Sequence, residues 1–173
     1  MPEQKLFSFD WALWFLWIMA TTLGWLVTNF LAIGVSYIAA GFAISLLQGF
    51  VLQSRIGHPF RWVVAGTIGW AIGWLIVLFA VPNGLEIING LVVGLAMGIA
   101  GWLVLRGEVH WAGWWIILSI VGWTTGLALL PGFLSTGSMA GALTGICLEL
   151  LLRNPLKPAS PKKPLNGVPD TEP

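Results

Sequence analysis

The sequence predicts an all-α, multi-pass membrane protein, and three observations lead to this prediction. Of its 173 residues, 57% are hydrophobic and only 9% are charged, whereas a soluble domain is usually about 25% charged. Apolar runs of about 20 residues, long enough to cross the hydrocarbon layer, recur between residues 11 and 153. The few basic residues fall only before the first run, after the last run, or between alternate runs. We therefore expect one six-helix transmembrane domain over residues 1–153.

Six apolar segments are expected to form the transmembrane helices, at about residues 11–30, 35–53, 62–81, 87–105, 111–130 and 137–152. Asn29 and Gly34 mark the first turn, the sequence Pro82-Asn83-Gly84 ends the third segment, and Pro131-Gly132 ends the fifth. Helices are favoured because backbone groups in lipid must be satisfied within the segment. The short alternating segments of a β-barrel are absent from the sequence.

The basic residues predict the orientation of these helices. All eight lie before the first segment, after the sixth, or in the second and fourth connections: Lys5, Arg55, Arg61, Arg106, Arg153, Lys157, Lys162 and Lys163. The other three connections carry Glu86 alone. Because lysine and arginine accumulate on the cytoplasmic side, we expect both termini in the cytoplasm, of a bacterial plasma or thylakoid membrane.

The first, third and fifth segments share one pattern, which is a tryptophan, a small residue four later, Gly-Trp at seven and eight, and a small residue at eleven. It is found at Trp17, Thr21, Gly24-Trp25 and Thr28, at Trp62, Gly66, Gly69-Trp70 and Gly73, and at Trp115, Ser119, Gly122-Trp123 and Gly126. Five matched positions in three copies indicate an internal repeat. We expect three tandem helical hairpins, at about residues 11–55, 62–106 and 111–153.

The even segments share rows of small residues at steps of four. The rows are Gly90, Gly94 and Gly98 in the fourth segment, Gly137, Gly141 and Gly145 in the sixth, and Gly41 and Ser45 in the second. Such rows allow close packing of helix backbones in lipid. We interpret them as packing contacts of the bundle, with contact to another subunit as the alternative.

Glu149 is the one ionisable residue clearly inside a predicted span, and intramembrane charges often mark function. It stands where the second hairpin has Trp102, and Arg153, one turn later, is placed to pair with it. The alternative is that Glu149 and Gln48 contact a ligand or partner. The deep tryptophans Trp70, Trp74 and Trp123 either pack the bundle or line a site for an apolar ligand.

The sequence favours no catalytic or metal site. His58 and His110 lie in predicted loops, so no Ser-His pair lies within the membrane, and the acidic residues are too scattered for a metal site. We expect no cofactor, and the net charge of +1 argues against nucleic acid as a partner. Residues 154–173, rich in proline and lysine, are expected to form a disordered cytoplasmic tail.

The repeated Gly-Trp pairs, with a span that ends GWLVLRG at residues 101–107, resemble the tryptophan-rich multi-pass membrane proteins of bacteria, of cyanobacterial type. That resemblance implies no established activity. Our first functional hypothesis is a non-enzymatic membrane protein that acts by association, as an accessory, assembly or scaffold subunit in a homo-oligomer or larger complex. The alternative is a transporter component or a protein that binds a lipid, quinone, vitamin or pigment, because six spans in this length resemble the substrate-binding subunits of energy-coupling-factor vitamin transporters.

Overall fold

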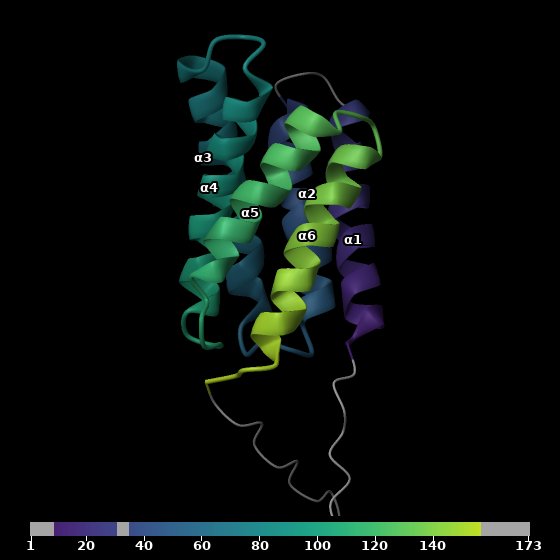
Figure 1. The fold of residues 1–173 in the computed structure, drawn as a ribbon, viewed down its shortest axis with the longest axis vertical. Coiled ribbons are helices and arrows are strands. Elements are labelled where there is room, and N and C mark those ends of the chain that lie inside the picture. The colour runs from purple at the N-terminus through teal and green to yellow at the C-terminus, as the bar shows by residue number, and fades with distance from the viewer. Residues whose placement is uncertain (1–8, 31–34, 157–173) are drawn as a thin grey trace, which may run out of the picture.

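The computed structural model describes residues 9–30 and 35–156, and over these ranges the chain is all-helical (Figure 1). Its α-helices are α1 (Trp11–Leu26), α2 (Val35–Leu52), α3 (Pro59–Ala80), α4 (Glu86–Leu105), α5 (Trp114–Thr124) and α6 (Ser135–Leu152). A 3₁₀ turn, η1 (Val27–Asn29), continues α1, and a π-helical turn, η2 (Thr125–Leu129), continues α5. In these ranges four helices, namely α1 with η1, α3, α4 and α6, are long and apolar enough to cross a membrane, whereas α2 and α5 are shorter apolar helices.

Proline and glycine set the ends of α3. This helix begins at Pro59, earlier than the predicted residue 62, because Pro59 occupies its first turn, where a missing N–H costs nothing. The predicted Pro-Asn-Gly turn follows its other end, and Gly84 has a φ of 87° there, a conformation that glycine adopts without strain.

The fifth helix begins later than predicted and ends in a wider turn. Trp111 has a left-handed backbone (φ 64°), so regular helix starts only at Trp114. At the other end the N–H of Leu130 donates to the carbonyl of Thr125, five residues back. The hydroxyl of Thr136 on α6 donates to the carbonyl of Gly126 at 3.0 Å, which satisfies one of the carbonyls that the wide turn frees.

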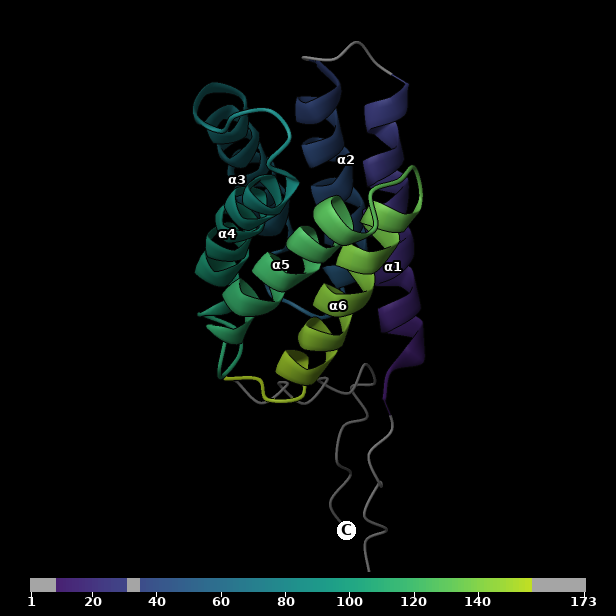
Figure 2. The same cartoon turned by 45° about the horizontal axis from the view of Figure 1, so that its top comes forward.

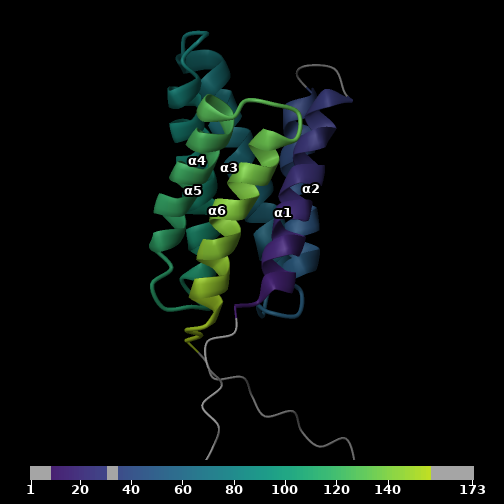
Figure 3. The same ribbon diagram turned by 45° about the vertical axis from the view of Figure 1, so that its right-hand side comes forward.

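The six helices form a closed ring. Each helix packs against its neighbours along the chain, and α6 also packs against α1. In Figure 2, α1 and α6 lie side by side in front of α2, and Figure 3 shows the same neighbours from another direction. No helix pair across the ring makes backbone-level contact in the described residues, so side chains fill the centre.

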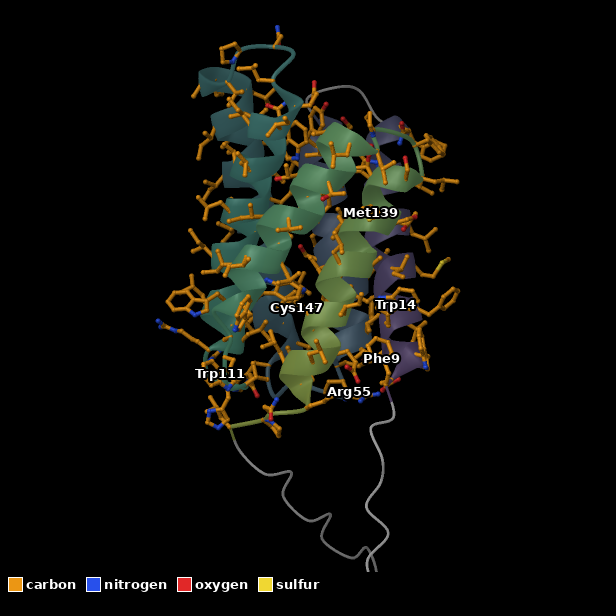
Figure 4. All side chains as sticks on the ribbon, viewed as in Figure 1. Phe9, Trp14, Arg55, Trp111, Met139 and Cys147 are labelled. Carbon is orange, nitrogen blue, oxygen red and sulfur yellow. The ribbon has the colours of Figure 1, made fainter. Side chains whose placement is uncertain are left out.

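The two ends of the ring differ in charge. The start of α1, the end of α6 and the α2–α3 and α4–α5 connections lie at one end, the lower end of Figure 1. All four described arginines, Arg55, Arg61, Arg106 and Arg153, belong to this end, and Figure 4 shows Arg55 there with Phe9 and Trp111. At the opposite end, Glu86 is the charged residue that the described segments contain.

Large apolar side chains cover the outside of the ring. Phe42, Ile68, Phe79, Leu103 and Ile117 are each about half exposed or more, and sticks project outward along the whole length of the helices (Figure 4). A soluble monomer rarely exposes apolar surface on this scale. The outer face is therefore suited to lipid.

Two predictions lie wholly or mainly outside the described residues. The tail expected from residue 154 onward is described only as far as residue 156, and Lys5, Lys157, Lys162 and Lys163 fall in the segments left out. The turn expected around Gly34 is likewise outside the described ranges.

Candidate functional site

Three tryptophans from alternate helices meet near the lower end of the ring. They are Trp17 of α1, Trp62 of α3 and Trp115 of α5, which hold the first position of the predicted repeat. Their ring centroids are 5.3–5.9 Å apart, all edge to face, and each residue is at most 4% exposed. Aromatic pairs favour this geometry. We call these three residues the lower triad; their rings fill the centre of the helix ring at this level.

A second set of tryptophans, the upper triad, lies eight residues further along the same helices. Trp25, Trp70 and Trp123 have centroid separations of 6.2, 6.3 and 4.7 Å. Eight helical residues rise about 12 Å, so the two triads form separate layers. Trp74 lies beside the upper triad, stacked on Tyr37 with centroids 4.1 Å apart.

Small polar side chains fill the level between the triads. Gln48 of α2 donates to the hydroxyl of Thr21 at 2.9 Å and accepts from the indole N–H of Trp62 at 3.2 Å. The indole N–H of Trp17 donates to Thr144 of α6 at 3.0 Å. The third indole N–H of the lower triad, that of Trp115, is buried with no hydrogen-bond partner among the described residues.

The rows of small residues pack inside the ring. A Cβ on Gly94 would lie 2.6 Å from the Cα of Ile120 on α5, and one on Gly141 would lie 2.9 Å from the Cα of Ile18 on α1. Gly41 and Ser45 of α2 face Trp70 and Gly66 of α3. Each row thus lies where one hairpin meets the next. These faces are not open to a second subunit.

The residues predicted as ligand contacts fall into two separate places. Trp70, Trp74 and Trp123 share one buried cluster. Glu149 lies about 22 Å away along the bundle, because it accepts the N–H of Asp10 at the start of α1, fifteen residues before Trp25. Gln48 is hydrogen-bonded between the triads and has no recorded contact with Glu149. These residues therefore do not form one site.

Glu149 is part of a charged cluster at the lower end of the ring. Its carboxylate is 4% exposed and pairs with Arg153 at 2.6 Å. Nearby, Asp10 pairs with Arg55 at 2.6 Å and caps α1 through the N–H of Leu13. The Leu13 N–H and the Arg55 guanidinium hold the pKa of Asp10 below its ordinary value. The cluster ties α1 to α6 and to the α2–α3 connection.

A groove of about 940 Å³ runs along the outer face between α3 and α4. Small residues form its floor, and larger aliphatic side chains such as Ile68 and Leu103 form its walls. The floor includes Ala65 and Ala100. A Cβ on Gly69 would lie 2.6 Å from the Cβ of Ala100, so the helices approach closely and leave a hollow between their outer side chains. Ligand sites commonly occupy about 300–1,000 Å³ and are mostly apolar.

The lower end of this groove is charged. Arg61 from the first turn of α3 and Arg106 at the end of α4 both line it, together with His58 and Glu108. Both arginines are exposed, and the guanidinium of Arg106 lies 5.3 Å from the ring centre of Trp102. The groove is therefore apolar along its length and polar at one end.

The third hairpin has the same groove in a smaller form. Between α5 and α6 its volume is about 340 Å³. At the spacings of the predicted repeat, Leu118 stands where α3 has Ala65, and Cys147 stands where α4 has Ala100. Both lie in the lining of the smaller groove. The larger side chains fill space that the second hairpin leaves open.

The described residues contain no group of three or more histidine, cysteine or acidic side chains that could hold a metal ion. Comparison with protein families, curated proteins and solved structures gave no match for this chain. Among the described residues, the groove between α3 and α4 has the size and the chemistry of a binding site.

Sequence reasoning did not find this groove. The signal was present, because aligning the second and third hairpins shows alanine opposite leucine at 65 and 118. The glycines and tryptophans that define the repeat face inward. Differences between copies on the outward face set the shape of the lipid-facing surface.

Proposed function

We propose that the protein is a six-span integral membrane protein built from three tandem hairpins, with the basic end in the cytoplasm. The closed ring supports this proposal, as do the apolar outer face and the four arginines at one end. The two triads support the threefold repeat, because matching tryptophans of α1, α3 and α5 meet in both layers. We place the protein in a bacterial plasma or thylakoid membrane.

Its proposed role is to bind an amphiphilic ligand from the bilayer, without catalysis. One observation carries this role, namely the 940 Å³ groove between α3 and α4. It is open on the apolar outer face, so a ligand with a hydrocarbon chain can enter sideways from the lipid. The packed tryptophan layers leave the centre of the ring an unfavourable place for such a ligand.

Adding bulk to the groove floor tests this role. We expect Ala65→Leu to lower the amount of bound amphiphile about tenfold, because leucine overpacks the floor. Leucine already occupies the matching position, 118, of the third hairpin, so the substitution suits the local fold. The measurement is native mass spectrometry of the full chain, purified in mild detergent with its co-purifying small molecules.

Ala12→Leu is the matched control, because Ala12 is exposed on α1 and does not line the groove. The control should bind as the unmodified protein does. If Ala65→Leu and Ala12→Leu retain the same amount of amphiphile as the unmodified chain, the groove is not the binding site.

Association with another membrane protein is the second candidate function. It is favoured by small residues at four-residue steps on both sides of the groove, Ala65 and Gly69 on α3 and Ala96 and Ala100 on α4. Such steps allow a partner helix to approach closely in lipid. Co-purification of a stoichiometric partner, or of a second copy, that is lost on Ala65→Leu would favour this candidate over amphiphile binding.

A further inference from the structure

The α3–α4 groove is apolar along its length but carries charged side chains at its lower end. Arg61 and Arg106 reach it from two different helices, on the side that we propose is cytoplasmic. By formal charge at pH 7, these four residues carry one net positive charge. The groove thus joins a hydrocarbon-sized hollow to a cationic end, which is the charge pattern complementary to an anionic amphiphile.

Comparison of the hairpins shows how Arg106 differs from its counterpart. At the repeat spacing, Arg106 of the second hairpin corresponds to Arg153 of the third. Arg153 is engaged by the carboxylate of Glu149, one turn earlier, at 2.6 Å. The residue one turn before Arg106 is Trp102, whose ring lies 5.3 Å from the guanidinium carbon. The second hairpin therefore holds its arginine against an aromatic face, and no carboxylate among the described residues forms an ion pair with it.

Arg61 likewise forms no ion pair with the described residues. Among residues 9–30 and 35–156, the ion pairs found are Arg55–Asp10 and Arg153–Glu149. Arg61 and Arg106, the two arginines in neither pair, are the two that line the groove. Two guanidinium groups at the end of an apolar groove fit a phosphate, because the planar guanidinium fork matches phosphate oxygens.

From this juxtaposition we infer that the groove binds an anionic glycerophospholipid. Its phosphodiester lies against Arg61 and Arg106, and an acyl chain lies over the floor at Ala65 and Ala100. One negative charge on the phosphodiester balances the net charge of the groove end. The inference rests on the proposed function, and it adds the charge and class of the head group.

Competition between two lipids that differ only in head group tests the inference. The full chain in mild detergent is incubated with equal amounts of dioleoyl phosphatidylglycerol and dioleoyl phosphatidylcholine, and native mass spectrometry measures both bound species. We expect phosphatidylglycerol to be preferred. Each arginine makes a charge-assisted contact, so Arg61→Ala with Arg106→Ala should lower that preference about tenfold or more.

Arg55→Ala is the control for each single substitution, Arg61→Ala and Arg106→Ala, because it too removes one arginine charge from the same end of the molecule, outside the groove. It should leave the preference unchanged. An equal loss in this control would mean that general surface charge, and not the groove, selects the lipid, and would overturn the inference.

The remaining outcomes separate this inference from the proposed function. If both lipids bind equally and Ala65→Leu weakens both, the groove stands and the head-group inference is wrong. If Ala65→Leu changes neither, the proposed groove itself is wrong. A protein partner that displaces both lipids from the groove would overturn the inference that the groove binds a lipid, and would favour association with a protein.

Discussion

At the scale of single residues, tryptophans at matching positions of the repeat differ in their hydrogen bonds. The three indole rings of the lower triad make equivalent edge-to-face contacts. Their N–H groups differ, because Trp62 donates to Gln48 and Trp17 donates to Thr144, whereas that of Trp115 is without a partner in the described residues. The position that Gln48 would match in the next hairpin is Gly101, and Trp115 lies against it. The triad is therefore similar in packing and dissimilar in hydrogen bonding.

This difference predicts unequal costs for equal substitutions. Trp62→Phe leaves the buried side-chain amide oxygen of Gln48 without its hydrogen-bond donor. Trp115→Phe removes an indole N–H that has no partner among the described residues. Both lose the same ring volume, so Trp62→Phe should lower the free energy of unfolding by about 1 kcal/mol more. Unfolding in mixed micelles, followed by helical circular dichroism, measures this difference. Equal costs for the two variants would contradict it.

At the scale of elements, the small residues of α2, α4 and α6 decide which helix each one packs against. In lipid there is little hydrophobic drive between helices, so close backbone approach must supply the contact energy. Gly90, Gly94 and Gly98 put α4 directly against the backbone of α5. The rows act between hairpins, and the sequence alone left open whether they faced another chain.

A methyl group in the α4 row should therefore separate two helices. At Gly94 a Cβ would meet the backbone of Ile120 and Ser119 at 2.6 and 2.8 Å, so neither side can move cheaply. We expect Gly94→Ala to lower the free energy of unfolding by about 1–3 kcal/mol, measured in mixed micelles.

Gly113→Ala is the control for this prediction. A Cβ at Gly113 would have no neighbour within 4 Å, and its φ of −59° suits alanine. Its effect should stay within about 0.5 kcal/mol. If Gly94→Ala were as mild as Gly113→Ala, the close contact of α4 with α5 would be refuted.

At the scale of the whole molecule, the ring depends on a closure that no local signal specifies. Helix α6 packs against α1, and the carboxylate of Glu149 accepts the N–H of Asp10 across 139 positions of sequence. With every helix in the ring, successive connections lie at opposite ends. This arrangement underlies the proposed topology.

Single cysteines in the connections test that topology. In a Cys147→Ala background, we expect Asn83→Cys to react with a membrane-impermeant maleimide in intact cells, because the α3–α4 connection is proposed to lie outside. His58→Cys and His110→Cys should react only after the membrane is opened. Labelling of all three from the same side would rule out the proposed arrangement of α3 and α4 as a spanning hairpin.

The sequence by itself determined the helical class, the approximate helix positions and the pairing of Glu149 with Arg153. These follow from local quantities, namely composition, run length and a spacing of one turn. Errors occurred at helix ends such as Pro59 and Trp111, where one residue's backbone conformation outweighs the hydrophobic pattern.

Only the tertiary structure decided which repeated residues meet, and where the outer surface is hollow. The meeting of Trp17, Trp62 and Trp115 needs three helices brought together from positions 45 and 53 residues apart in the sequence. The groove arises because Ala65 and Ala100, ordinary in either helix alone, face the same space once α3 and α4 pack. Side-chain periodicity tells which face of a helix is buried, whereas the shape between two helices depends on both at once.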